Sequence, residues 1–328
     1  MSRTTTPEMA QQARIVLVLQ QLRDPGFWAD WTAVVALVLL VIVFGIASPT
    51  FLSWGNVQAI LVAAAILVML SVGQAYVIMT AGIDLSVASV LTLGSVVLGQ
   101  TINRGWGIAL ACVLAVIAST LVGLINGLVI AKGKITDFIV TLGTLSAAAG
   151  AALVLSNGEP VTVTSVFLLR LATGSLGPIP YFVIIAAVVA IVGHIVLFHT
   201  RFGTHLLATG GEPEAARAMG IDTDRVKIAA YVISGFLAGL ASILLTARIG
   251  AAEPAANTTF LLNSVAAVVL GGVSLFGGRG TVVGPVVGAL LLTALVNGLT
   301  LLSVPVFYQP LAVGIIVVLA ALLMRYQR

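Results

Sequence analysis

Ten long apolar runs constrain the fold of this chain more than any other feature of its sequence. They cover residues 30–48, 57–80, 85–102, 106–131, 136–155, 179–198, 227–247, 260–275, 281–302 and 308–324. An α-helix needs about 20 apolar residues to cross the hydrocarbon core of a bilayer. Charged residues make up only 8% of the chain, whereas soluble domains carry about 25%. The sequence therefore predicts an all-α polytopic membrane protein with about ten transmembrane helices.

The basic residues are divided unequally between the connections on the two sides of these runs. A cytoplasmic N-terminus places twelve of the 15 Lys and Arg residues inside and three outside. Cytoplasmic loops are enriched in Lys and Arg, so both termini are predicted to be cytoplasmic. The inside residues are Arg3, Arg14, Arg23, Lys132, Lys134, Arg201, Arg217, Arg225, Lys227, Arg279, Arg325 and Arg328, and the outside residues are Arg104, Arg170 and Arg248.

The predicted organisation is one membrane domain with short ends and no inserted soluble domain. Residues 1–29 are expected to form a cytoplasmic N-terminal segment, part of which is an amphipathic helix on the membrane surface. Residues 30–324 form the transmembrane domain, and residues 325–328 form a cytoplasmic tail. Two connections are long, 156–178 outside and 199–226 inside, and the inside connection has the highest density of charge in the chain.

Within 199–226 the sequence predicts a short helix of two turns at the cytoplasmic surface. Pro213 suits the first turn of a helix because its missing N–H needs no partner there. Glu212 and Glu214 lie at the positive end of the helix dipole, and Gly220 can end the helix in a left-handed conformation.

Two interpretations of this short helix stay open from composition. It is either part of a solvated loop or a docking element for another protein. In a docking helix, small Ala side chains allow close approach and Arg217 can meet a carboxylate. The residues predicted to take part in docking are Gly211, Glu212, Glu214, Ala215, Ala216, Arg217 and Gly220.

The stretch TAGIDLS at 80–86 places a carboxylate, Asp84, between two apolar runs. Gly82 can break one helix, and Asp84 can cap the next, whose first N–H groups lack acceptors within the helix. A structural cap and a hinge or gate at the inner end of a pathway are both compatible with this pattern. The stretch GGVSLFGG at 271–278 echoes it, which is consistent with an internal repeat of the kind found in transporters.

Uncharged polar side chains inside the spans are the candidates for a solute pathway. Ionisable groups within spans are costly and usually functional, and only Asp84 and Asp137 come close to this description. This scarcity argues against a carrier coupled to protons or sodium ions. For each candidate the alternative is ordinary hydrogen bonding between helices. The residues predicted for the pathway or its gate are Gly82, Asp84, Ser86, Gln74, Asn126, Thr141, Thr144 and Asn297.

Several chemical functions are disfavoured by the sequence. A Walker A motif requires Gly-Lys-Ser/Thr, and the lysines Lys132, Lys134 and Lys227 are followed by Gly, Ile and Ile. The three histidines lack the spacing of a helical metal site. The net charge of +4 is not gathered into a basic cluster, so nucleic-acid binding is not expected. We predict no catalytic residues, metal site or cofactor, and no enzyme activity.

Four blocks of the sequence resemble the ribose-type permease family, the membrane subunits of bacterial ABC sugar importers. They are TAGIDLSVAS at 80–89, FIVTLGTLSAAAG at 138–150, the stretch from TRFGTH to AAEP at 200–254, and the stretch from SVAAVV to LTLL at 264–302. The resemblance extends from about residue 30 to residue 324. It departs from the family at three positions. Ala81 stands where the family usually has Gly, Asp137 stands where a Pro commonly precedes Phe-Ile-Val-Thr-Leu-Gly, and Asn263 occupies a position that is often acidic.

The resemblance implies a permease that forms the translocation path for a monosaccharide or related polyol in the bacterial inner membrane. A cytoplasmic ABC ATPase subunit would engage a coupling helix within 199–226, and an external solute-binding protein would deliver the solute. A second permease chain would complete the path, most simply as a homodimer, with a heterodimer as the alternative. Two other classes stay open from the residues, a secondary transporter of a small neutral solute and an intramembrane enzyme.

Overall fold

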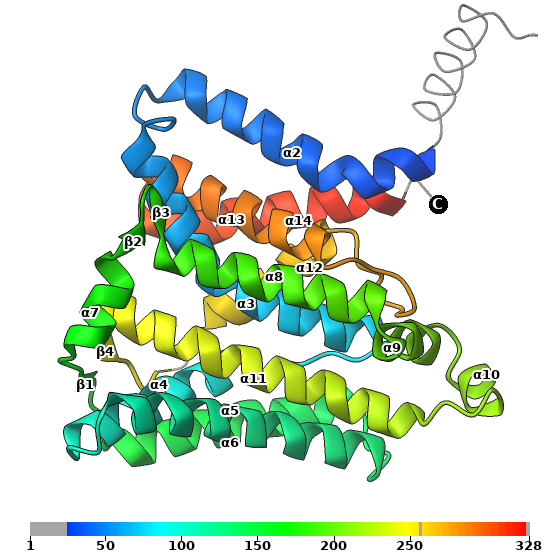
Figure 1. Ribbon diagram of the computed structural model, residues 1–328. Coiled ribbons are helices and arrows are strands. Elements are labelled where there is room, and N and C mark those ends of the chain that lie inside the picture. The colour runs from blue at the N-terminus through cyan, green and yellow to red at the C-terminus, as the bar shows by residue number, and fades with distance from the viewer. Residues whose placement is uncertain (1–24, 256–257, 326–328) are drawn as a thin grey trace, which may run out of the picture.

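The computed structural model describes residues 25–255 and 258–325 and shows a bundle of helices that run back and forth between two ends (Figure 1). In the described part, six helices are long and apolar enough to cross a membrane, and four shorter helices are also apolar. Each of the ten predicted runs coincides with one of these helices. They are α2 (Pro25–Ala47), α3 (Trp54–Met79), α4 (Val87–Asn103), α5 (Ile108–Ala131), α6 (Asp137–Ser156), α8 (Tyr181–His199), α11 (Thr223–Ile249), α12 (Thr258–Leu270), α13 (Val283–Leu301) and α14 (Gln309–Arg325).

The connections at the outer end of the bundle, at the left in Figure 1, contain small ordered elements. A two-stranded pairing of β1 (Val161–Thr162) with β4 (Ala251–Ala252) joins the two outer loops. The helix α7 (Val166–Thr173) and the hairpin of β2 (Ser175–Leu176) and β3 (Ile179–Pro180) complete the first of these loops. A 3-10 turn, η1 (Val306–Tyr308), precedes α14.

The helix α3 forms the centre of the bundle, because its residues from Ala64 to Met79 are all buried. The helices α5 and α11 pack closely against one another beside it. A Cβ atom added at Gly123 would lie 2.3 Å from the Tyr231 carbonyl oxygen, and one added at Gly235 would lie 2.6 Å from the Ser119 carbonyl oxygen. Small residues thus bring the two backbones together, as is usual for helix pairs in membranes.

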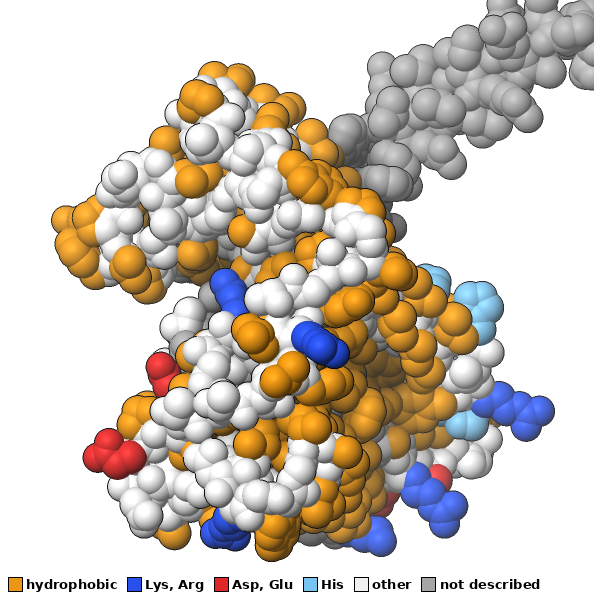
Figure 2. Space-filling model, turned by 60° about the vertical axis from the view of Figure 1, so that its left-hand side comes forward, with side chains coloured by type: hydrophobic (Ala, Val, Ile, Leu, Met, Phe, Trp, Pro, Cys, Tyr) orange, Lys and Arg blue, Asp and Glu red, His pale blue; other side chains and the backbone are white. Residues whose placement is uncertain are grey.

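Hydrophobic side chains cover much of the flank of the bundle in Figure 2, while the His side chains and several of the Lys and Arg side chains lie toward the right-hand edge of that view. The exposed residues along α2, α5, α6 and α8 include many large aliphatic side chains. A soluble protein rarely exposes apolar patches of this extent. The surface therefore fits a chain whose flanks face lipid and whose ends face water.

The structure differs from the sequence prediction in one additional helix and in one helix boundary. The inside connection contains two helices, α9 (Arg201–Gly211) and α10 (Pro213–Ala218), of which only the second was predicted. The Thr200 side chain caps α9 by accepting from the Gly203 N–H at 3.4 Å, and Leu206 is buried. In addition, α2 begins at Pro25 rather than at residue 30. Residues 1–24 and 326–328, most of the predicted terminal segments, lie outside the described residues.

Candidate functional site

The chain breaks its helical course between α3 and α4 and turns back into the bundle. The end of α3 lies beside the connection between α12 and α13, because the Gly278 N–H donates to the Met79 carbonyl oxygen at 3.0 Å. Residues 82–86 then run into the bundle without helical hydrogen bonds until α4 begins at Val87. Non-helical backbone at membrane depth is tolerated only where the protein itself supplies the missing hydrogen-bond partners.

Side chains of three neighbouring helices bind the backbone of this break. The Ile83 carbonyl oxygen accepts from the Tyr231 hydroxyl at 3.2 Å and from the Thr141 hydroxyl at 3.4 Å. The Gln74 carboxamide faces the Asp84 backbone. Its nitrogen donates to the Asp84 carbonyl oxygen at 3.1 Å, and its oxygen accepts from the Asp84 N–H at 3.2 Å. The Gln74 side chain thereby acts as a short strand partner for the unwound segment.

The Asp84 carboxylate is the centre of a buried polar network and is only 2% exposed. One oxygen, Oδ1, accepts from the Ser86 N–H at 3.0 Å and from the Ser86 hydroxyl at 2.6 Å. The other, Oδ2, accepts from the Ser234 hydroxyl at 2.8 Å. The Asn126 carboxamide donates to the Ser86 hydroxyl at 2.9 Å. This network connects the break to α5 and α11.

The positions of Asn126 and Ser234 give the depth of the network. Asn126 lies five residues before the inner end of α5, which is about 8 Å along the helix. Ser234 lies eleven residues after the start of α11, which is about 16 Å along that helix. The Asp84 carboxylate between them is therefore well inside the bundle. A buried charge at this depth needs several hydrogen-bond donors, and Asp84 has three.

The structure gathers most of the predicted polar candidates at this break. Two candidates lie elsewhere in the bundle. The Thr144 hydroxyl donates to carbonyl oxygens of its own helix, at 3.1 Å to Val140 and at 3.2 Å to Thr141. Asn297 exchanges two hydrogen bonds of 3.0 Å with Asn56 and so joins α13 to α3. The candidates that meet at the break are Gln74, Gly82, Asp84, Ser86, Asn126 and Thr141.

Sequence reasoning missed two of the residues that hold the break, Tyr231 and Ser234 on α11. Both lie about 150 positions from their partners and resemble ordinary span residues in the sequence. Asp137, noted in the sequence as an ionisable residue near a span and as a departure from the family pattern, accepts from the Tyr231 hydroxyl at 3.1 Å. The helical spacing of Tyr231 and Ser234, three residues apart, places them on one face and was the only available signal.

The backbone of the turn differs from the expectation that Gly82 breaks the helix. Ala81, rather than Gly82, adopts the left-handed conformation, with φ of 60°. Gly82 is needed for space, because a Cβ atom there would lie 2.6 Å from Asp137 Oδ2 and 2.9 Å from the Tyr231 hydroxyl oxygen. The predicted cap is also different. Ser86 is the residue preceding α4, and the Asp84 carboxylate binds Ser86 rather than the first N–H groups of the helix.

A junction of glycines joins the cytoplasmic helix α9 to the start of the break. A Cβ atom at Gly210 would lie 1.8 Å from the Met79 carbonyl oxygen and 2.8 Å from the Gly278 nitrogen. A Cβ atom at Gly277 would lie 2.6 Å from the Gly210 carbonyl oxygen and 2.7 Å from the Ala81 nitrogen. We call the residues Met79, Ala81, Gly210, Gly277 and Gly278 the glycine junction. Three separate segments are in backbone contact there.

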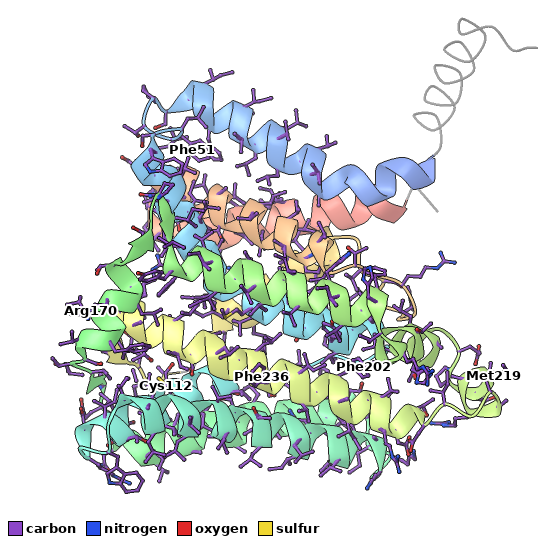
Figure 3. All side chains as sticks on the ribbon, in the orientation of Figure 1. Phe51, Cys112, Arg170, Phe202, Met219 and Phe236 are labelled. Carbon is purple, nitrogen blue, oxygen red and sulfur yellow. The ribbon has the colours of Figure 1, made fainter. Side chains whose placement is uncertain are left out.

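The helix α10 projects beyond the end of the bundle, with Met219 at its tip (Figures 1 and 3). The Arg217 side chain, which the docking interpretation left available for a carboxylate, is bound within its own chain. Its Nε donates to the Thr223 hydroxyl at 2.8 Å, and its guanidinium lies 3.6 Å from Asp224. Lys134 also donates to both Asp224 oxygens, each at 2.9 Å. Asp224 therefore links α10, the first turn of α11 and the turn between α5 and α6.

The bundle faces lipid, polar side chains stabilise the unwound segment between α3 and α4, and a short helix projects at the cytoplasmic end. These features together define a membrane transport subunit. The comparisons with known proteins agree with this class. A family model described as "Branched-chain amino acid transport system / permease component" matches residues 56–322. The chain belongs to this permease family.

Relatives within the family are sugar permeases. The chain is 34% identical over 304 residues to the ribose import permease protein of Haemophilus influenzae, covering 92% of this chain and 94% of that protein. It is 39% identical over 291 residues to the ribose import permease protein of Bacillus subtilis, covering 88% and 90%. It is 34% identical over 295 residues to the L-arabinose ABC transporter permease protein of Azospirillum brasilense, covering 90% and 87%. The protein is therefore a multi-pass permease of the bacterial inner membrane rather than an enzyme.

Proposed function

We propose that this chain forms the translocation path of a bacterial ABC importer for a monosaccharide or related polyol. A separate cytoplasmic ATPase drives it through α10, an external solute-binding protein supplies the solute, and a second copy of the chain completes the path. The similar proteins import ribose, L-arabinose and D-allose by name, which supports a sugar substrate. The observation that carries the proposal is the glycine junction, where the cytoplasmic loop rests on the end of α3.

The exposed surface of α10 is the proposed ATPase docking surface. Glu212, Glu214, Ala215 and Gly220 are exposed, whereas Ala216 is buried against the bundle. Met219 beside them is 83% exposed, although it lies at an end of the molecule that faces water. A flexible apolar side chain of this kind suits a protein interface. We define the docking surface as the exposed residues of 211–220.

Two physical connections lead from this docking surface to the helix break. The first is direct, because α9 places the Gly210 backbone against Met79 at the start of the break. The second runs through α11. Arg217 holds α10 to Thr223 at the start of α11, and Tyr231 and Ser234 on the same helix bind the break. A rigid movement of α10 would therefore displace both ends of the break together.

We further propose that the break and its polar network form the gate of the path. Gln74, Asn126 and Thr141 hold the unwound segment closed, and a shift of α11 would withdraw two of its donors. Gly82, Asp84 and Ser86 form the moving part. Thr144 and Asn297 remain predictions for the pathway, with bonds to their own helix and to Asn56 in this conformation.

The test is uptake by proteoliposomes that contain this chain, its ATPase and the loaded binding protein. We expect uptake of radiolabelled ribose, arabinose or allose only when ATP is present on the cytoplasmic side. Uptake by the chain alone under an ion gradient would support a secondary transporter instead. The docking surface is tested by Met219→Asp, which should abolish uptake and ATPase binding while the chain stays in the membrane. The matched control is Leu176→Asp, an exposed apolar residue of β2 at the outer end, which should leave ATPase binding intact.

A further inference from the structure

A cavity of about 350 Å³ opens at the outer end of the bundle, on the opposite side of the network from α10. It lies between α4, the outer end of α11, the loop that contains β4, and α12. Figure 2 turns this outer end toward the viewer and shows a notch in the surface. The polar lining residues are Thr92, Ser95, Arg248 and Glu253, and Phe260 adds an aromatic ring.

The lining of this cavity has the chemistry of a site for a small neutral polyhydroxylated solute. Arg248 supplies N–H donors and Glu253 supplies carboxylate acceptors. Within the described residues, the ion pairs all lie at the cytoplasmic end, so neither side chain is paired in the cavity. The hydroxyls of Thr92 and Ser95 donate to carbonyl oxygens of α4 at 3.0 and 3.1 Å and retain lone pairs for a ligand. Phe260 can cover the apolar face of a sugar ring.

The size and depth of the cavity agree with a solute of this kind. Ligand pockets hold about 300 to 1,000 Å³, so this cavity suits a small molecule. Thr92 lies eleven residues from the outer end of α4, about 16 Å along the helix. The floor of the cavity is therefore formed by α4, the same helix whose inner end is held at Asp84.

We propose that this cavity is the outward-facing binding site for the transported solute, a monosaccharide or similar polyol, with Arg248 and Thr92 as contacts. The inference rests on the proposed import function and adds the place and chemistry of solute binding. Release of the Asp84 network would move the inner end of α4 and thereby the floor of the site.

The single cysteine of the chain makes a direct accessibility test practical. The Thr92→Cys variant is made in a Cys112→Ser background and is treated from the outside with a membrane-impermeant methanethiosulfonate reagent. We expect modification about tenfold faster than that of Ser71→Cys, a fully buried control on α3. Ribose, L-arabinose or D-allose, added free or on the loaded binding protein, should slow the reaction. Equal rates for the two variants, or no protection by any of these sugars, would overturn the proposal.

The second measurement is uptake by Arg248→Gln, with Arg104→Gln as the matched control. Both arginines lie on the outer side, but Arg104 does not line the cavity. We expect uptake of Arg248→Gln to fall about tenfold, because a charge-assisted hydrogen bond to the solute is lost. Equal uptake by the two variants would overturn the proposal even when the wild-type chain imports sugar. If the wild-type chain imports none of the three sugars, the proposed function is contradicted instead. The modification rates of Thr92→Cys with and without sugar would still decide whether the cavity binds a sugar.

Discussion

Two breaks between helices meet at the cytoplasmic end of the bundle, and they are held in different ways. The first, at 80–86, is bound by side chains of α3, α5, α6 and α11. The second, at 271–282, is stabilised mostly by its own turn. There the Ser274 N–H donates to the Arg279 carbonyl oxygen at 3.1 Å, and the Gly277 N–H donates to the Ser274 carbonyl oxygen at 3.0 Å.

The two breaks also differ in burial and in backbone conformation. Asp84 in the first is 2% exposed, whereas Phe276 in the second is 76% exposed. Positive φ angles in the second break belong to glycines, Gly272, Gly277 and Gly278, but in the first break to Ala81. The comparison indicates that the second break is a fixed surface turn. In the first, the strained residue Ala81 is exposed, whereas Gly82, Asp84 and Ser86 are buried. The conformation of the first break depends on other helices, and it is the one suited to move.

The largest expected effect on stability is at the centre of the first break. Asp84→Ala removes an acceptor from three buried hydrogen bonds and should lower the free energy of unfolding by about 2–4 kcal/mol. Ser274→Ala, the matched change in the second break, should cost less than about 1 kcal/mol because water can reach that turn. Thermal unfolding in detergent measures both. Equal losses would mean that the two breaks are equivalent.

The next effect is at the glycine junction, where the two breaks touch. Gly210→Ala forces a Cβ atom against the Met79 carbonyl oxygen and should cost about 1–3 kcal/mol and most of the uptake. Gly150→Ala on α6 is the control, because no atom lies within 4 Å of a Cβ atom added there. Uptake and membrane abundance are measured together. A Gly210→Ala protein that transports normally would show that close contact of these segments is not needed.

A smaller effect on stability distinguishes backbone strain at Ala81 from steric crowding at Gly82 within the first break. Ala81→Gly should raise the free energy of unfolding by about 1 kcal/mol, since glycine adopts positive φ without steric cost. Gly82→Ala should lower it by about 1–3 kcal/mol, because the added methyl group meets Asp137 and Tyr231. Opposite signs in a melting experiment support the assignment. A destabilised Ala81→Gly protein would contradict it.

The helices could be predicted from the sequence because apolar runs of sufficient length have few alternatives in a bilayer. The break at 80–86 was also visible, from one glycine and one carboxylate between apolar runs. Its depth was not, because that depends on Tyr231 and Ser234, which are distant in sequence and unremarkable in composition. The helix α9 was missed because Gly210 and Gly211 resemble a loop. Their small size instead allows backbone contact with the junction.

The central claim is that movement of the docking surface reaches the helix break through α11 as well as through the glycine junction, so that loss of the α11 connection alone weakens the coupling. The most direct test is the number of sugar molecules imported per ATP hydrolysed by Tyr231→Phe in the complete transporter. This change removes only the hydroxyl that binds Ile83 and Asp137. The account predicts that ATP hydrolysis continues while import per ATP falls about tenfold, the effect of about 1.4 kcal/mol of lost coupling. An unchanged ratio would contradict it.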